Sequence, residues 1–118
     1  MVWSCLVSIL PGMAQTEKLT DYVNPFVGTD GYGNVYPGAQ IPFGGIQISP
    51  DTDSRFYDAA SGYKYNHLTL MGFSLTHLSG TGIPDLGDFL FIPGTGEMKL
   101  EPGTHEDPDQ GYRSRYSH

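Results

Sequence analysis

A single histidine stands between a short apolar run and a loop of glycines and hydroxyl side chains, in the stretch GFSLTHLSGTG at 72–82. If residues 68–74 form a strand, the imidazole of His77 lies at or just beyond its end, where binding sites are commonly built. The loop that follows offers hydroxyls and backbone N–H groups to a ligand, from Ser79, Gly80, Thr81 and Gly82. The alternative is a structural histidine, because no H-x-x-x-H metal spacing accompanies it. Ser79 lacks the G-x-S-x-G context of a hydrolase nucleophile.

A second candidate is the glycine-rich stretch NPFVGTDGYGNVYPG at 24–38. Its glycines let the backbone approach another surface closely, while the side chains of Thr29, Asp30 and Asn34 can hydrogen-bond to hydroxyl groups. Such a loop suits the rim of a sugar site. The alternative is an Asx-turn loop, in which these side chains cap their own backbone. Neither a P-loop nor a complete G-x-G-x-x-G pattern occurs in the chain, so nothing predicts a phosphate-binding loop.

The acidic residues form three groups, which are Asp51 and Asp53, Asp85 and Asp88, and Glu106, Asp107 and Asp109. None of the groups has the glycine and the twelfth-position glutamate of a calcium-binding loop. Paired carboxylates can act as the acid and base of glycoside hydrolysis, but only when they face each other across a sugar. Sequence spacing does not show such facing, so we assign no catalytic residue and no metal ligand in this chain.

The elements that must position these residues are short strands separated by turns. Alternating or continuous apolar residues predict strands at 45–49, 68–74 and 88–92. Prolines at positions 50, 93 and 102 predict turns beside them, and no segment keeps a helical apolar period for long. Short strands with frequent turns favour an all-β fold, either an antiparallel sandwich or a barrel.

Composition limits the chain to one domain and excludes one class of partner. With 118 residues and 38% hydrophobic content, it can bury one modest core. Six Lys and Arg against 13 Asp and Glu give a net charge of −7. Nucleic acid is therefore not expected as a partner, because phosphate binding needs a basic surface.

Residues 1–14 read as a signal peptide. The apolar run at 2–10 is too short to span a bilayer, and Gly12-Met13-Ala14 offers a small-x-small cleavage site, so we expect export. No Lys or Arg precedes the run, so the alternatives are a start further upstream or a buried segment that mimics a leader. Cys5, the only cysteine, lies in this segment, and the mature chain would have no disulfide.

Three stretches in this order resemble the amino-terminal region of the glycoside hydrolase family 92 α-mannosidases. They are DYVNPFVGTDGYGNVYPGAQIPFGGIQISPDT, SGYKYNH and GFSLTHLSGTGIPDLGDFLFIPGTG, and the resemblance covers nearly the whole of residues 15–118. It implies an exported bacterial enzyme, periplasmic, outer-membrane-attached or secreted, that removes terminal α-linked mannose from glycans. The implied mechanism is inverting and calcium-dependent.

The resemblance also implies a division of labour between two domains. Residues 15–118 would be part of an amino-terminal β-sandwich that packs on an (α/α) helical barrel, and the barrel would supply the general acid, the general base and most calcium ligands. His77 and residues 79–82 would line the wall of the mannose pocket, with Thr29 and Asp30 nearby. The barrel is absent from this chain, so we expect the chain alone to be an inactive, marginally stable fragment.

The chain departs from the family pattern at three polar or small positions in these loops. The first loop commonly reads G-T-G-G-H-G-H in relatives, where this chain has GTDGYGN at 28–34, and the usual S-H-T-H is SLTH at 74–77. If the family's histidines at these positions touch the substrate, this chain's linkage preference, or activity itself, is expected to differ. Two alternatives stay open, a free-standing carbohydrate-binding module without catalysis and a purely structural interaction domain. A completed sheet would favour the module, whereas this chain stops after YRSRYSH.

Overall fold

The computed structural model describes residues 17–53, 57–80, 83–84 and 87–117. The predicted signal peptide at 1–14 therefore lies outside the described residues. Within them the chain forms short strands and three single-turn 3-10 helices. The strands are β1 (Ser49–Asp51), β2 (Thr69–Leu70), β3 (Gly72–Ser74), β4 (Leu90–Phe91) and β5 (Ser114–Arg115), and the helices are η1 (Leu19–Tyr22), η2 (Tyr57–Ala59) and η3 (Pro108–Gln110). The all-β prediction is confirmed.

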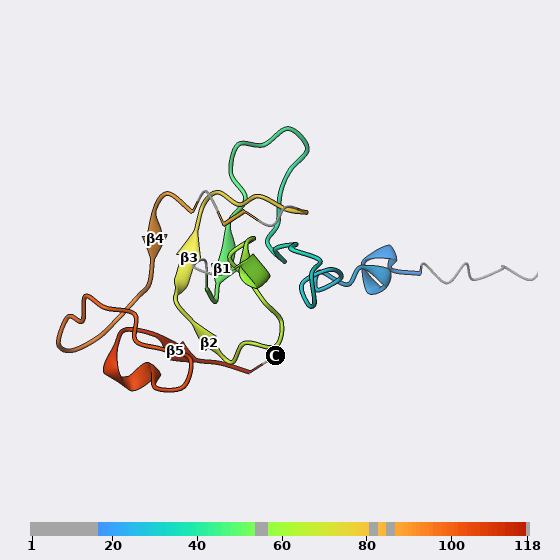
Figure 1. The fold of residues 1–118 in the computed structure, drawn as a ribbon. Helices are drawn as coiled ribbons and strands as arrows, with labels where there is room; N and C mark the ends of the chain where they lie inside the picture. The colour runs from blue at the N-terminus through green and yellow to red at the C-terminus, as the bar shows by residue number, and fades with distance from the viewer. Residues whose placement is uncertain (1–16, 54–56, 81–82, 85–86, 118) are drawn as a thin grey trace, which may run out of the picture.

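Two antiparallel sheets organise these strands. In the first, β3 lies between β1 and β4, with Ser74 opposite Ser49 on one side and opposite Leu90 on the other. In the second, β2 pairs with β5, with Thr69 opposite Arg115. Figure 1 shows β2 leading into β3, so one stretch of chain contributes a strand to each sheet. The described residues contain no helix long and apolar enough to cross a membrane.

The prediction of a single strand at 68–74 is wrong, because the segment is divided at Met71. The Met71 N–H donates to the carbonyl of Asp51 at 2.7 Å, outside the ladder of either sheet. At the next position a Cβ on Gly72 would lie 2.7 Å from the carbonyl oxygen of Phe91, so β3 and β4 approach each other over a glycine. The division sends the chain from one sheet to the other.

Of the other two strand predictions, the one at 88–92 is confirmed only for Leu90–Phe91, and the one at 45–49 is wrong except for its last residue, Ser49. The strand expected at 45–49 begins only at Ser49, after an isolated bridge between Ile48 and Ala39, and it continues through Pro50. A turn at Pro50 was therefore a wrong expectation. Proline is tolerated there because β1 is an edge strand with one neighbour, so its missing N–H removes no ladder bond on the open side. The strand expected at 88–92 is reduced to β4.

The buried residues are mostly polar. The buried apolar side chains in the described part are Ala59, Ala60, Tyr63 and Met71, whereas Ser49, Asp51, Thr52, Asp53, Thr69, Ser74, His77 and Arg113 are also buried. On the opposite face of the first sheet, Phe73 and Phe91 pair with each other and remain 38% and 58% exposed. Most buried polar groups in proteins are hydrogen-bonded, and here side-chain hydrogen bonds connect many of these residues.

Candidate active-site wall

The two predicted loops meet in the structure. The N–H of Gly80, in the loop after His77, donates to the carbonyl of Asn34, in the glycine-rich stretch, at 2.7 Å. The ring of Tyr36, from the same stretch, lies against the His77 ring with 5.0 Å between their centroids. Two segments that are more than 40 residues apart in sequence therefore form one surface.

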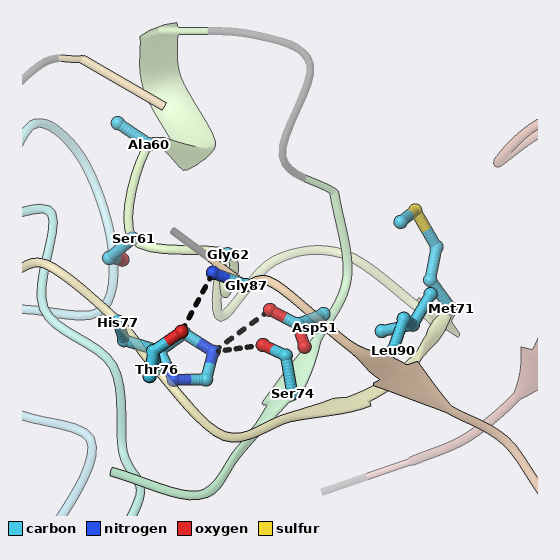
Figure 2. A pocket seen from close by; sticks show the side chains of 10 residues that line it. All are labelled: Asp51, Ala60, Ser61, Gly62, Met71, Ser74, Thr76, His77, Gly87 and Leu90. Atoms are coloured by element: carbon cyan, nitrogen blue, oxygen red, sulfur yellow. Dashed lines mark hydrogen bonds and ion pairs between the residues drawn. The ribbon is translucent and has the colours of Figure 1, made fainter. Parts of the chain in front are cut away.

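His77 is buried, and both nitrogens of its ring are within hydrogen-bond distance of other groups. Its Nδ1 lies 2.7 Å from the carbonyl oxygen of Gln47, and its Nε2 lies 2.9 Å from both Asp51 Oδ1 and Ser74 Oγ. Figure 2 shows the Asp51 and Ser74 side chains pointing at the same ring nitrogen. A carbonyl and a carboxylate only accept hydrogen bonds, so both ring nitrogens must carry hydrogen and the ring is an imidazolium.

The pKa of His77 follows from the same contacts. Burial lowers it, but the hydrogen bond to Asp51, the bond to the Gln47 carbonyl and the Coulombic attraction of the Asp51 carboxylate together raise it above its ordinary value. The direction agrees with an imidazolium held between two acceptors. The result is a buried ion pair between His77 and Asp51, with 2.9 Å between nitrogen and oxygen.

The local sequence explains how these three side chains come together. In the antiparallel register Ser49 lies opposite Ser74 and Asp51 lies opposite Gly72, so Asp51 and Ser74 project from the same buried face. Gly62, in the chain after η2, then approaches them so closely that a Cβ there would lie 2.1 Å from Asp51 Oδ1. Glycine at this position makes room for the ion pair.

The arrangement is not a serine-hydrolase triad. In a triad the serine and the carboxylate occupy different nitrogens of the histidine, with the carboxylate on Nδ1. Here Ser74 and Asp51 both contact Nε2, and Nδ1 is used by a backbone carbonyl. Since the imidazolium has no free nitrogen to accept a proton from Ser74, the cluster positions the loop rather than activating a nucleophile.

The remaining predicted site residues differ in exposure. Thr29 is only 2% exposed and its hydroxyl donates to the Phe26 carbonyl at 2.8 Å, whereas Asp30 is exposed and caps the Gly31 N–H at 2.8 Å. These are the local caps of the Asx-turn alternative. Ser79 and Gly80 are exposed beside the His77 cluster. Thr81 and Gly82 lie outside the described residues.

Sequence reasoning missed Asp51, Ser74, Gln47 and Gly62 as partners of His77. The only available signal was Asp51 in the acidic pair of SPDTD, which carries no information about its partner. It also missed a second buried pair, in which Arg113 Nη2 lies 3.3 Å from Asp53 Oδ2, with His105 Nε2 3.2 Å from the same oxygen.

The described residues do not fit a calcium site on their own. No group of three or more His, Cys, Asp or Glu side chains that could hold a metal occurs among them. Of the buried carboxylates, Asp51 is paired with His77, and Asp53 with Arg113. Calcium prefers six to eight oxygen ligands, with several from carboxylates that are not already committed.

The ion pair makes stability depend on pH. Because the folded-state pKa of His77 is raised, its contribution is complete below the ordinary pKa of about 6.5 and is lost as the pH rises through the folded-state value. We expect the difference in free energy of unfolding between the wild type and His77→Gln to be largest at pH 6 and to shrink towards pH 9. Urea unfolding at each pH measures it, and a constant difference would contradict the assignment of the ion pair.

Comparison with known proteins identifies the family of this chain. Residues 22–118 match the model of the glycosyl hydrolase family 92 N-terminal domain. The chain is also similar to a protein of Arthroderma benhamiae described as an uncharacterized secreted glycosidase, with 36% identity over 73 residues, which are 61% of this chain and 9% of that protein. The chain thus spans a small part of that relative's length. The match over 22–118 includes both loops of the site and shows that this chain belongs to the glycosyl hydrolase family 92 N-terminal domain family.

Proposed function

We propose that this chain is the amino-terminal part of an exported exo-α-mannosidase, which removes terminal α-linked mannose from glycans. The observation that carries the proposal is the family match over residues 22–118, which includes the loop junction at Gly80 and Asn34. The exposed Ser79, Gly80 and Asp30 form the wall of the mannose site. His77 holds that wall in position through its three buried contacts. The secreted relative supports export.

Inverting hydrolysis needs an acid on the leaving oxygen and a base that activates water on the opposite face of the sugar. The two buried carboxylates of the site region do not suit these roles, because Asp51 is paired with His77 and Asp53 with Arg113. We therefore assign the acid, the base and the calcium requirement to the helical-barrel part of the whole protein. This chain contributes shape and hydrogen bonds to the sugar.

The experiment uses the whole protein that carries this chain, with α-linked mannobiosides as substrates. We expect mannose release from the non-reducing end, with the β-anomer appearing first by NMR, and loss of activity in a chelator that added calcium reverses. The 118-residue chain alone should release nothing. Release of another sugar, or of the α-anomer first, would contradict the proposal.

The wall itself is tested by substitution. Ser79→Ala and Asp30→Ala each remove one exposed polar group from the wall, so we expect kcat/KM of the whole protein to fall about tenfold, equivalent to ~1.4 kcal/mol. Asp109→Ala is the control, because its side chain is 85% exposed and lies against Arg115, far from His77 in the sequence. An equal effect of all three substitutions would argue against a wall at Ser79 and Asp30.

A second candidate function, glycan binding without catalysis, is favoured by one observation. The exposed rings of Tyr32 and Tyr57 lie with 6.5 Å between centroids at an angle of 59°, next to the Asp30 loop. Exposed aromatic faces are typical contacts for sugars. If this is the function, the whole protein retains mannan without releasing mannose, and Tyr32→Ala abolishes the retention.

A further inference from the structure

The buried carboxylate of Asp51 has one oxygen that remains unpaired. Its Oδ1 accepts from His77, but within the described part of the chain no group donates to its Oδ2, although the residue is only 4% exposed. Asp51 lines a cavity of about 70 Å³ that is also bordered by Ser61, Ser74 and Thr76. Figure 2 shows these side chains around the cavity. A buried carboxylate oxygen without a donor is unfavourable, so the cavity calls for a ligand that donates.

The same cavity also offers a donor. Ser74 Oγ shares the single hydrogen of His77 Nε2 with Asp51 Oδ1, because the imidazolium nitrogen has no lone pair to receive the serine hydrogen. The Ser74 hydroxyl hydrogen is therefore directed elsewhere, and Ser74 borders the cavity together with Asp51. The cavity is therefore bordered by one acceptor, Asp51 Oδ2, and one donor, the Ser74 hydroxyl. This pair matches a ligand hydroxyl group, which both donates and accepts a hydrogen bond.

Charge excludes the competing ligand classes. A cation at Asp51 Oδ2 would face the neighbouring imidazolium of His77, 2.9 Å from Oδ1 of the same carboxylate. An anion would face the carboxylate. The site is therefore suited to a neutral ligand.

Size limits how much of a ligand enters. A volume of about 70 Å³ exceeds the ~10–15 Å³ that one water molecule needs. It is far below the ~300 Å³ of a pocket that encloses a whole small-molecule ligand. The cavity can take one hydroxyl or hydroxymethyl group, but not a sugar ring.

We propose that Asp51 Oδ2 and Ser74 Oγ bind one hydroxyl group in this cavity, supplied either by water or by a saccharide. The hydroxyl donates to the carboxylate and accepts from the serine. The saccharide source rests on the proposed function, because Ser79 and Gly80 of the mannose wall lie two and three residues after His77 in the chain. The water source is independent of it.

The experiment is NMR on the whole protein that carries this chain, and the two added probes are ethylene glycol and methyl α-mannoside. A bound water gives cross-peaks between water and the methyl groups of Ala60 and Thr76, which border the cavity. A bound polyol gives saturable shifts of the His77 ring signals. We expect Ser74→Ala to weaken the polyol response at least tenfold or to remove the water cross-peaks, while Asp109→Asn, at an exposed carboxylate, leaves both unchanged.

Each outcome either identifies the source of the hydroxyl group, water or saccharide, or shows that the site does not exist. Water cross-peaks without polyol shifts support the site with water as its ligand, and shifts with methyl α-mannoside support the saccharide. Absence of both, or a Ser74→Ala chain that responds like the wild type, overturns the proposal. Ser74→Ala keeps the ion pair of Asp51 and His77, so it is preferred to Asp51→Asn as the test. An occupied cavity in a whole protein that releases no mannose would refute only the proposed function.

Discussion

Gly62→Ala is expected to lower the free energy of unfolding by about 3–5 kcal/mol, through overpacking and backbone strain together. The new methyl carbon would lie 2.1 Å from Asp51 Oδ1 and 3.1 Å from Cδ2 of the His77 ring. Neither neighbour can move without breaking the buried ion pair. Gly62 also has φ +87°, a conformation that residues with a Cβ rarely adopt. Urea unfolding followed by circular dichroism measures the loss.

Gly96→Ala is the matched control for this substitution. Gly96 has a similar φ of +85°, but a Cβ there meets nothing within 4 Å. It therefore carries the backbone strain without the clash, and we expect a loss of only about 1–2 kcal/mol. Equal losses for the two variants would show that backbone strain alone explains the effect, and that the packing of Gly62 against Asp51 and His77 contributes nothing.

The fold class was predictable because turn residues and short apolar runs are local signals. Prolines and glycines between brief apolar segments predicted an all-β chain, and β2, β3 and β4 lie within the segments expected to form strands. The division of 68–74 at Met71 was not predictable. It depends on a hydrogen bond to the Asp51 carbonyl and on the approach of Phe91 to Gly72, which are both contacts between segments distant in sequence.

The candidate site was predictable in part for the same reason. The loop after His77 and the glycine-rich stretch are each visible in the sequence, and their resemblance to one family implied that they lie together. The partner of His77 was not visible, because Asp51 is 26 residues away and only the register of β1 against β3 brings it to the ring. Whether Thr29 and Asp30 contact a sugar stays a prediction, and Thr29 contacts it only if its bond to the Phe26 carbonyl is exchanged.

Arg113→Met is expected to have the second large effect, a loss of about 3–5 kcal/mol, because it removes the guanidinium that pairs with the buried carboxylate of Asp53. Both side chains of this pair are fully buried. Arg113 also donates to the carbonyls of Thr52 and Gly103, so it ties the chain after β1 to the segment before η3. Arg115→Met is the control, because its pair with Asp109 is exposed at 3.7 Å, and we expect a change within about 0.5 kcal/mol.

The double variant Asp53→Leu with Arg113→Met separates charge from packing. If the loss in Arg113→Met comes from a buried carboxylate that has lost its guanidinium partner, removing that carboxylate should restore part of the stability. We therefore expect the double variant to be more stable than Arg113→Met by about 1–3 kcal/mol. A double variant as unstable as the single one would mean that the hydrogen bonds of Arg113 to the Thr52 and Gly103 carbonyls, and not the ion pair, hold these segments together.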